Sequence, residues 1–523
     1  MERLLSDFYT KETAEMSGFI SREGTSNPLV TGIEYDSRNV KPGNIFFALS
    51  GLHTDGSLYI EDAVKNGAVV VIHESDNIKS NADIVCIKVK NARFAMAPVS
   101  ASYYKFPSKR LLVTGVTGTE GKSTTVFLIW QLLTLLGKKA GFISTVQHSL
   151  GEKALFNVEH QTTPEAPVIQ KLLCEMADNG CEYAVLETSS HGLSKKTNRL
   201  GNVNFCCGVL TNVTHEHLEF HGTWEQYRDD KANLFRAVNE FVTSEDMDSF
   251  EPFGVANADD KSARHFSKLL DYKTFFFSHE GRDSDLVLEV IKSSAWGNWY
   301  VLFSPAQKER IEIRDKLPGA FNSSNVMAAL LAVSGLTNLP LREIAQYVKK
   351  LKPVMGRMTA VDKGQPFEVV VDYAHTPSSF QAIFPPLFRR IKKKGAKIIS
   401  VFGSAGERDT QKRGEQGKIA ALYSDIIVIT DEDPRGEEPM AICEEIARGC
   451  YEANIEHEKI IRDENLFLIP DRPSAIRKAI SLAGKGDLVL LLGKGHENSI
   501  IYKDYTMPFD EITEAEKALG DAF

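Results

Sequence analysis

Short apolar runs rich in β-branched residues recur along the chain, separated by longer stretches with a helical pattern. Apolar runs of about four to eight residues are typical of buried strands, and their alternation with helices is typical of parallel α/β sheets. The expected strands are 44–49, 68–72, 84–89, 110–115, 141–146, 183–188, 205–212, 367–374, 397–404, 425–430 and 487–493. The expected helices include 440–453 and 122–137, the latter closed by Gly137 as a C-terminal cap.

These runs fall into three series, and each series can form its own mostly parallel, doubly wound sheet. The chain has 523 residues, a length that suits about three domains. We therefore expect an α/β protein with domains at 1–108, 109–353 and 354–523.

Composition and charge narrow the class of protein. Hydrophobic residues make up 42% and charged residues 25% of the chain, which is ordinary for a soluble globular protein. A net charge of −9 argues against nucleic-acid binding. The first residues lack the apolar core of a signal peptide, and the longest apolar segment, 126–136, is too short to span a bilayer. We expect a cytoplasmic protein with no membrane insertion, whose seven cysteines are buried, reduced thiols.

The stretch "VTGVTGTEGKSTT", residues 113–125, predicts a phosphate-binding loop. Its spacing is G-x-x-G-x-x-G-K-S, so Val116 stands where the common phosphate loop has its first glycine. A strand, a glycine turn and a helix N-terminus together form an anion site. Lys122 can neutralise phosphate and the Ser123 hydroxyl can bind Mg²⁺. The loop predicts binding of ATP and Mg²⁺ but does not identify the reaction that uses them.

Acidic and imidazole groups follow this loop at the ends of two expected strands. Glu187 ends a strand that should lie beside the loop strand, where a carboxylate suits Mg²⁺. The stretch 215–221 holds three histidines, but it lacks the H-E-x-x-H spacing and the thiolate partners of zinc sites. A phosphate and Mg²⁺ site is therefore the better interpretation. Lys231 lies on an expected helix with two acidic residues before it, and this local pattern alone predicts a solvated helix face.

Together the motifs resemble those of the Mur ligase family, of the MurE type. The quoted segments occur in this order along nearly the whole chain: "YDSRNVKPGNIFFALSGLHTDG", "GVTGTEGKSTT", "TTPE", "LETSSHGL", "TNVTHEHLEFHGTWEQYRDDKANLF", "GAFNSSNVMAAL", "GRM", "VVVDYAHTP", "FGSAGERDTQKR", "DEDPRGEEP" and "GKGHE". Each segment alone is a weak signal, whereas ten or more in register are highly specific.

The resemblance implies an ATP-dependent ligase that joins a diamino acid to the D-Glu of UDP-MurNAc-L-Ala-D-Glu during peptidoglycan synthesis. It also implies a role in cell-wall biogenesis, cell shape, the cell cycle and cell division. The substrate carboxylate would attack the γ-phosphate, and the amine would then attack the acyl phosphate. The implied fold has a UDP-binding α/β domain, a central phosphate-loop ATPase domain and a C-terminal Rossmann-like domain. The enzyme is expected to be a monomer whose domains close around one site.

The resemblance also assigns site residues by matching motif positions. The expected catalytic residues are Lys122, Glu187, His217 and Lys231, the last as a carbamylated lysine; Ser123, Glu187, His217 and Lys231 are the expected Mg²⁺ positions. The expected ATP positions are Gly118, Thr119, Glu120, Gly121, Lys122, Ser123, Thr124, Asn325, Arg357, Asp372 and His375. UDP-MurNAc-dipeptide binding is expected at Ser37, Leu52, His53, Thr54, Thr162, Thr163, Ser189 and Arg199. Diamino-acid binding is expected at Arg408, Glu432, Asp433, Pro434, Arg435, Gly493 and Glu497.

Among the departures from the family pattern, two change the charge of an expected site. Glu120 replaces the usual Asn and brings a negative charge close to the phosphates. Asp433 replaces the Asn of the diaminopimelate-type sequence, whereas Arg435 is retained. A guanidinium suits the distal carboxylate of meso-diaminopimelate, and an additional carboxylate suits an ammonium. We expect meso-diaminopimelate, with L-lysine or L-ornithine as the alternative.

Other classes of protein are less compatible with the sequence. A folylpolyglutamate-synthetase-like ligase would not need the N-terminal "DSR…PG…FFAL" segment. An ATP-hydrolysing motor would have no use for "DYAHTP" and "GKGHE". A non-catalytic regulator would not need to retain Lys122, Glu187, His217 and Lys231.

Overall fold

The computed structural model describes residues 1–50, 55–76, 84–157, 162–214, 218–242, 250–294, 297–454 and 460–522. The expected site residues Leu52, His53, Thr54 and His217 lie outside these ranges. The chain forms two compact units. The first comprises Met1–Glu289, Leu302–Ile311 and Ser324–Tyr347; the second comprises Val290–Val301, Glu312–Ser323 and Val348–Phe523.

The first hundred residues form a five-stranded sheet with the order β2-β7-β6-β5-β4. Its strands are β2 (Phe19–Glu23), β4 (Gly32–Glu34), β5 (Asn44–Phe47), β6 (Val70–His73) and β7 (Val85–Val89), and β1 (Arg3–Leu4) pairs separately with β3 (Leu29–Val30). The helices are α1 (Lys11–Met16), α2 (Ile60–Lys65) and α3 (Ala92–Tyr103). Only β2 runs antiparallel to its neighbour; β4, β5, β6 and β7 are parallel.

Successive residues of a strand in this sheet enter two different cores. Ile45 and Phe47 of β5 pack in the cluster that contains α3, whereas Phe46 packs with Ile60 and Ala63 of α2. A strand covered on both faces must be apolar at every position, which explains the continuous run "NIFFAL".

The central sheet has eleven strands in the order β11-β10-β9-β12-β8-β13-β14-β15-β16-β17-β18. The strands are β8 (Leu112–Thr117), β9 (Ala140–Ile143), β10 (Gln147–Ser149), β11 (Leu155–Phe156), β12 (Tyr183–Glu187), β13 (Phe205–Leu210), β14 (Phe253–Asn257), β15 (Thr274–Ser278), β16 (Leu286–Ser294), β17 (Gly297–Ser304) and β18 (Glu309–Arg314). The helices are α4 (Lys122–Leu135), α5 (Ala166–Asp178), α6 (Ser190–Leu193), α7 (Leu218–His221), α8 (Trp224–Asn239), α9 (Ala263–Ser267), α10 (Asn322–Thr337) and α11 (Leu341–Ala345).

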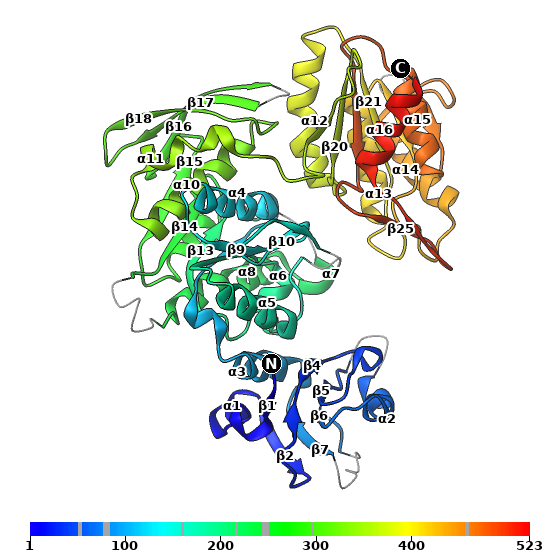
Figure 1. The fold of residues 1–523 in the computed structure, drawn as a ribbon. Coiled ribbons are helices and arrows are strands. Elements are labelled where there is room, and N and C mark those ends of the chain that lie inside the picture. Colours follow the sequence, from blue (N-terminus) through cyan, green and yellow to red (C-terminus); the bar gives the residue numbers. More distant parts are fainter. Residues whose placement is uncertain are drawn as a thin grey trace. The chain divides into compact units, whose positions relative to one another are not determined.

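Helices cover both faces of this sheet, with α4 and α10 on one face and α5 and α8 on the other (Figure 1). The loop strand β8 lies between β12 and β13 and is parallel to both. Glu187 of β12 pairs in register with Val116 of β8, which confirms the prediction that Glu187 ends a strand beside the phosphate loop.

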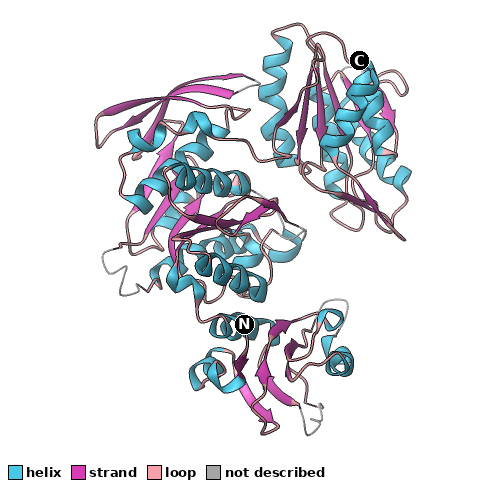
Figure 2. Ribbon diagram, viewed as in Figure 1, coloured by secondary structure: helices cyan, strands magenta, loops and turns pink. Residues whose placement is uncertain are grey.

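The C-terminal part forms a sheet with helices packed against it (Figure 2). Its six strands have the order β19-β20-β24-β21-β22-β23, and only β19 is antiparallel to its neighbour. The strands are β19 (Thr359–Val361), β20 (Glu368–Asp372), β21 (Ile398–Phe402), β22 (Ile426–Ile429), β23 (Leu466–Leu468) and β24 (Leu488–Leu492), with a separate ribbon of β25 (Ser499–Ile501) and β26 (Thr506–Pro508). The helices are α12 (Pro377–Lys392), α13 (Gln411–Tyr423), α14 (Pro439–Asn454), α15 (Arg472–Leu482) and α16 (Glu511–Ala522). One core packs the sheet against α12, α13 and α14, and the other packs it against α15 and α16.

Every strand expected from the sequence is present, within a few residues at its ends. Gly137 adopts the left-handed backbone conformation expected of a helix C-terminal cap, with φ 78°. The sequence did not predict β14–β18, the β25–β26 ribbon or the antiparallel strands at the sheet edges. All seven cysteines are buried and unbridged, as expected. Within the described ranges, no helix has the length and apolar character needed to cross a membrane.

Candidate active site

The phosphate loop is residues 118–121, between β8 and α4, and its glycines are required by close contacts. Gly118 and Gly121 have φ of 150° and 84°. A Cβ on Gly118 would lie 1.9 Å from Thr211 Oγ1, and one on Gly121 would lie 2.5 Å from Asn325 Oδ1. Val116 belongs to β8 and is fully buried, so the loop begins after it. The unusual spacing therefore reflects a strand that extends to residue 117.

The residues that follow β13 hold the backbone of the loop. The Glu120 N–H donates to Asn212 Oδ1 at 3.0 Å, and the Glu120 carbonyl accepts from Thr211 Oγ1 at 2.6 Å. Lys122 Nζ donates to the Thr119 carbonyl at 2.7 Å. The loop is thus fixed in place at the N-terminus of α4, where helix N–H groups and the helix dipole favour an anion.

Ser123 and Glu187 meet at the base of this loop. Ser123 Oγ donates to Glu187 Oε1 at 3.0 Å, and the Thr145 N–H donates to Glu187 Oε2 at 2.9 Å. Both side chains are buried, with 5% and 3% of their surface exposed. A hydroxyl and a carboxylate oxygen this close together suit a hard cation such as Mg²⁺. In the described part of the chain, no group of three or more His, Cys, Asp or Glu residues has the arrangement of a metal site.

Lys231 of α8 is buried beside the same loop, with 1% of its surface exposed. Its Nζ donates to the Gly118 carbonyl at 2.6 Å and lies 4.4 Å from the centre of the Tyr227 ring. The Tyr227 hydroxyl is 3.1 Å from Thr119 Oγ1. The prediction of a solvated helix face, made from the local pattern alone, is therefore wrong, because α8 directs this polar side chain toward the phosphate loop.

Three expected dipeptide-binding residues, Thr163, Ser189 and Arg199, lie together at the C-terminal end of β12. Thr163 Oγ1 donates to the Glu187 carbonyl and accepts from the Ser189 N–H, both at 3.0 Å. Arg199 Nη1 donates to the Thr163 carbonyl at 2.9 Å. Arg199 and Arg93 of α3 both pair with Glu165 Oε1, at 3.0 and 2.8 Å. Thr162 is the half-buried neighbour of Thr163.

Three further expected residues of the first unit, Asn325, Thr124 and Ser37, lie in helix α10, in helix α4 and in the N-terminal domain. Asn325 at the start of α10 accepts from Thr125 Oγ1 at 3.3 Å, which links α10 to α4. Thr124 is half-buried in the first turn of α4. Ser37 is buried in the first domain, where its carbonyl accepts from Asn66 Nδ2 at 2.9 Å.

In the second unit, Arg357, Asp372 and His375 surround Tyr373. Asp372 accepts from the N–H groups of Met358 and Ala374 at 2.7 and 2.8 Å. Burial raises the pKa of the Asp372 carboxyl, and the nearby Arg357 guanidinium opposes that shift. The Arg357 guanidinium lies 4.6 Å from the centre of the Tyr373 ring, and His375 Nδ1 lies 2.9 Å from the Tyr373 carbonyl oxygen.

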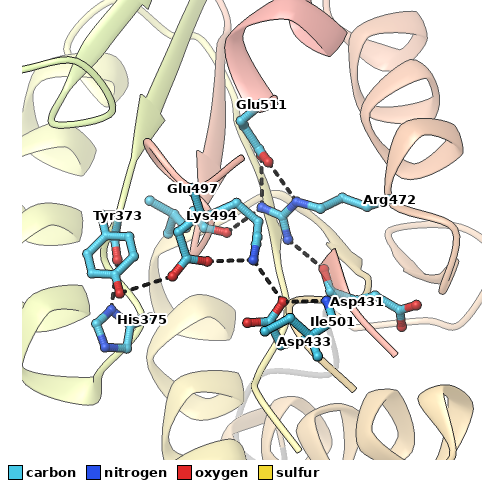
Figure 3. A network of polar contacts seen from close by, with 10 residues as sticks. Tyr373, His375, Asp431, Asp433, Arg472, Lys494, Glu497, Ile501 and Glu511 are labelled. Atoms are coloured by element: carbon cyan, nitrogen blue, oxygen red, sulfur yellow. Dashed lines mark hydrogen bonds and ion pairs between the residues drawn. The ribbon is translucent and has the colours of Figure 1, made fainter. Parts of the chain in front are cut away.

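The expected diamino-acid residues lie after three strands: Arg408 follows β21, residues 432–435 follow β22, and Gly493 and Glu497 follow β24. Figure 3 shows the contacts of Asp433 and Glu497. Asp433 Oδ1 accepts from Lys494 Nζ and from the Ile501 N–H, both at 2.9 Å. Lys494 Nζ also donates to Glu497 Oε2, and Glu497 Oε1 accepts from the Tyr373 hydroxyl at 3.3 Å. The negative charge that the sequence places at Asp433 is therefore already paired with an ammonium of the protein.

The other expected residues of this group differ in exposure. Arg408 is exposed and Arg435 is half-buried, with its backbone in the left-handed region at φ 54°. Glu432 is buried and lies beside Gly493, and Pro434 is buried too. Arg435 Nε and Glu432 Oε2 are buried without a hydrogen-bond partner among the described residues. Orphaned polar atoms of opposite charge suit a zwitterionic ligand.

Two features of the site were not anticipated from the sequence. His221 Nδ1 lies 2.7 Å from Asp230 Oδ2, and its Nε2 lies 3.0 Å from Ser190 Oγ, all three side chains being buried. This chain of hydrogen bonds ties α8 to the segment that follows Glu187. The second is the buried Lys494. In the sequence, a lysine placed between two glycines was the signal that could have indicated this buried residue.

A parallel sheet with a glycine loop between a strand and a helix, and with Ser123 and Glu187 at its base, defines a nucleotide-binding protein of the phosphate-loop class. Known families match most of the chain: "Mur ligase family, catalytic domain" at residues 29–104, "Mur ligase middle domain" at 116–333 and "Mur ligase, glutamate ligase domain" at 356–495.

Relatives match the chain over nearly its whole length. It is 50% identical to UDP-N-acetylmuramyl-tripeptide synthetase of Treponema denticola, over 98% of each chain. It is 47% identical to the protein of that name from Treponema pallidum, over 94% of this chain and 93% of the other. A solved UDP-N-acetylmuramoyl-L-alanyl-D-glutamate–2,6-diaminopimelate ligase is 27% identical, with a TM-score of 0.60 over 94% of this chain and 95% of that one. The chain belongs to the Mur ligase family and, within it, to the MurE type.

Proposed function

We propose that this protein, an ATP-dependent ligase of peptidoglycan synthesis, adds a diamino acid to the D-Glu carboxylate of UDP-MurNAc-L-Ala-D-Glu. The observation that carries the proposal is the Ser123–Glu187 pair beneath a phosphate loop, in a chain of this family. The names of the relatives supply the substrate class. The three segments 1–108, 109–353 and 354–523 are proposed to serve the UDP-linked substrate, ATP and the diamino acid.

The reaction we propose proceeds through an acyl phosphate. A carboxylate oxygen attacks the γ-phosphorus of ATP, and ADP leaves. The amine nitrogen then attacks the acyl carbon, the C–O bond to phosphate breaks, and the nitrogen loses its proton as phosphate leaves. Two anions must approach each other in the first step, so positive charge and N–H groups around them are the main requirement.

The residues of the first unit suit that step. The N-terminus of α4 offers backbone N–H groups, and Lys122 is placed to exchange the Thr119 carbonyl for a phosphate oxygen. Ser123 and Glu187 would hold Mg²⁺, which supplies Lewis-acid stabilisation of the phosphates when bound. We place Lys231, as its carbamate, and His217 with this group, and Asn325, Arg357, Asp372 and His375 with ATP.

The substrates are assigned to two further groups. Ser37, Leu52, His53, Thr54, Thr162, Thr163, Ser189 and Arg199 are proposed for the UDP-linked dipeptide. Arg408, Glu432, Asp433, Pro434, Arg435, Gly493 and Glu497 are proposed for the diamino acid. Because these residues come from different domains, we propose that catalysis requires domain closure. The enzyme is proposed to act in the cytoplasm as a monomer and to support cell-wall growth, shape and division.

Among diamino acids we propose meso-diaminopimelate. Arg435 offers an unpaired guanidinium nitrogen, and a guanidinium binds a carboxylate in a bidentate manner. The charge of Asp433, which would have favoured L-lysine or L-ornithine, is compensated by Lys494. Those two amino acids remain the alternative, because Glu432 offers an unpaired carboxylate oxygen for an ammonium.

The test measures phosphate release by the purified chain with ATP, UDP-MurNAc-L-Ala-D-Glu and each diamino acid, singly and in competition. ATP consumption should require both the dipeptide and the diamino acid, and meso-diaminopimelate should win the competition. Arg435→Ala should remove that preference, whereas Arg448→Ala, at an exposed position of α14, should keep it. Rapid ATP turnover without either substrate would exclude the ligase function, and equal rates for all three amino acids would exclude the role of Arg435.

A further inference from the structure

The sequence Gly493-Lys494-Gly495 forms a turn that places a lysine inside the second unit. Both glycines have left-handed backbones, with φ of 106° and 51°. A Cβ on Gly495 would lie 2.7 Å from Tyr373 Cβ, so the turn packs closely against the segment after β20. Lys494, between the two glycines, keeps only 1% of its surface exposed. A lysine is almost never fully buried unless its charge is paired.

Two carboxylates provide that pairing. Lys494 Nζ donates to Asp433 Oδ1 at 2.9 Å and to Glu497 Oε2 (Figure 3). Burial by itself lowers the pKa of the Lys494 ammonium, but Glu497 and Asp433 raise it above its ordinary value. The lysine is therefore a permanent cation of the folded protein at physiological pH.

The two carboxylates are in turn attached to the walls of the proposed diamino-acid pocket. Asp433 accepts from the Ile501 N–H at 2.9 Å, and the Arg435 N–H donates to the Ile501 carbonyl at 2.9 Å. Glu497 accepts from the Tyr373 hydroxyl, whose pKa is raised by burial and by Glu497, so that it stays a donor. The Lys494 ammonium thus links the segment that carries Arg435 to the segment that carries Tyr373.

We propose that Lys494 is the positioning residue of the diamino-acid pocket: its buried ammonium holds the carboxylates of Asp433 and Glu497 in place and limits the negative charge that the pocket presents to the substrate. This inference rests on the proposed function. None of the sequence motifs assigned Lys494 to a ligand. Its contribution is made through Asp433 and Glu497 rather than by contact with the substrate.

The charge of the cluster defines the expected behaviour of its variants. Asp433, Glu497 and Lys494 together carry one net negative charge, since two carboxylates face one ammonium. Lys494→Met keeps most of the length of the side chain and leaves two carboxylates without the ammonium. The double variant Lys494→Met with Asp433→Asn returns to one negative charge. A pocket with two uncompensated carboxylates favours a substrate with a net positive distal end.

The experiment is steady-state kinetics of the full chain with the diamino acid that the wild type uses. Lys494→Met should raise the KM for the diamino acid by about tenfold or more and leave the KM for ATP within about twofold. It should also raise the ratio of kcat/KM for L-lysine and L-ornithine over that for meso-diaminopimelate. The charge-balanced double variant should return the KM for the diamino acid most of the way to the wild-type value, which a merely structural role would not produce.

A matched control and a second variant keep the test decisive. Lys418→Met removes an exposed lysine of α13, paired with Glu452, and should change none of these constants. If Lys494→Met does not fold, Lys494→Arg, which keeps the charge and several donors, should stay within about threefold of the wild-type KM, and Lys494→Gln should not.

The possible failures are distinguishable. A wild-type chain whose ATP turnover ignores the diamino acid would overturn the proposed function and this inference with it. The inference alone would be overturned if the ATP turnover of the wild type depends on the diamino acid but the KM for the diamino acid is unchanged in Lys494→Met. Where Lys494→Met does not fold, an unchanged KM in Lys494→Gln would have the same meaning.

Discussion

The Ser123 hydroxyl donates a 3.0 Å hydrogen bond to Oε1 of Glu187, joining the first turn of α4 to the end of β12. The second carboxylate oxygen is held by the Thr145 N–H at 2.9 Å. A carboxylate fixed at both oxygens beside a phosphate loop is preorganised, so that its charge faces a cation without rearrangement. The pair provides the most direct test of the proposed Mg²⁺ position.

Glu187→Gln keeps the shape of the side chain and removes its charge. We expect kcat to fall by about 10²-fold or more, and the Mg²⁺ concentration at half-maximal rate to rise. ATP turnover measured across a Mg²⁺ titration checks both effects. Glu182→Gln, an exposed position at the other end of the same strand region, is the matched control and should behave as wild type. Equal Mg²⁺ dependence in the two variants would contradict the assignment.

Lys231→Ala tests the proposed carbamate. The side chain is buried beside the Gly118 carbonyl, so its loss removes an ionisable group next to the phosphate loop. We expect kcat to fall by about 10²-fold or more, and acetate at high concentration to restore part of the activity, because a small carboxylate can replace the carbamate. Lys231→Arg keeps a positive charge and cannot be carbamylated, so it should stay inactive. Full activity of Lys231→Ala would exclude the carbamate role.

Gly118→Ala tests the close contact beneath the phosphate loop. The added Cβ would lie 1.9 Å from Thr211 Oγ1, and the backbone has φ 150°. We expect a loss of stability of about 2 kcal/mol or more and a weaker affinity for ADP, measured by thermal unfolding and calorimetry. Gly414→Ala in α13 meets nothing within 4 Å. That variant should be neutral or stabilised by roughly 0.5–1 kcal/mol.

Asp431 should make the stability of the second unit depend on pH. Burial raises the pKa of its carboxyl to about 6, although the Tyr502 hydroxyl donates to it. Between pH 4 and 6, the folded protein holds a proton that the unfolded chain has lost. The stability from this group is therefore full below about pH 4 and is lost as the pH rises through about 6.

Asp431→Asn removes this dependence because an amide oxygen can still accept from Tyr502 and carries no charge. We expect the variant to be more stable than wild type by roughly 2 kcal/mol above pH 6.5 and equal to it near pH 4. Thermal unfolding from pH 4 to 8 measures the difference. Asp504→Asn, in the exposed turn between β25 and β26, should follow the wild-type curve. Parallel curves for Asp431→Asn and wild type would contradict the raised pKa.

Lys231 shows what the local sequence pattern can and cannot predict about burial. Two acids precede the lysine on an expected helix, and this pattern favours a solvated face. In α8, however, Tyr227, Asp230, Lys231 and Leu234 are all buried. Polar residues on a buried face can be recognised only when their partners are known, and the partner of Lys231, the Gly118 carbonyl, lies more than a hundred residues away in the chain. The motif resemblance, rather than the periodicity, identified this position.

The sequence by itself determined many of the buried strands, the helix that follows the phosphate loop, and the glycines at 118 and 121, because apolar periodicity and turn geometry depend on residues close together in the chain. The strand β8 ends at Thr117, which accounts for Val116 in the loop pattern. Tertiary structure alone decided that Ser123 meets Glu187 and that Asp433 is paired with Lys494. Burial and charge pairing depend on contacts between segments far apart in the sequence, and only the packed fold brings those segments together.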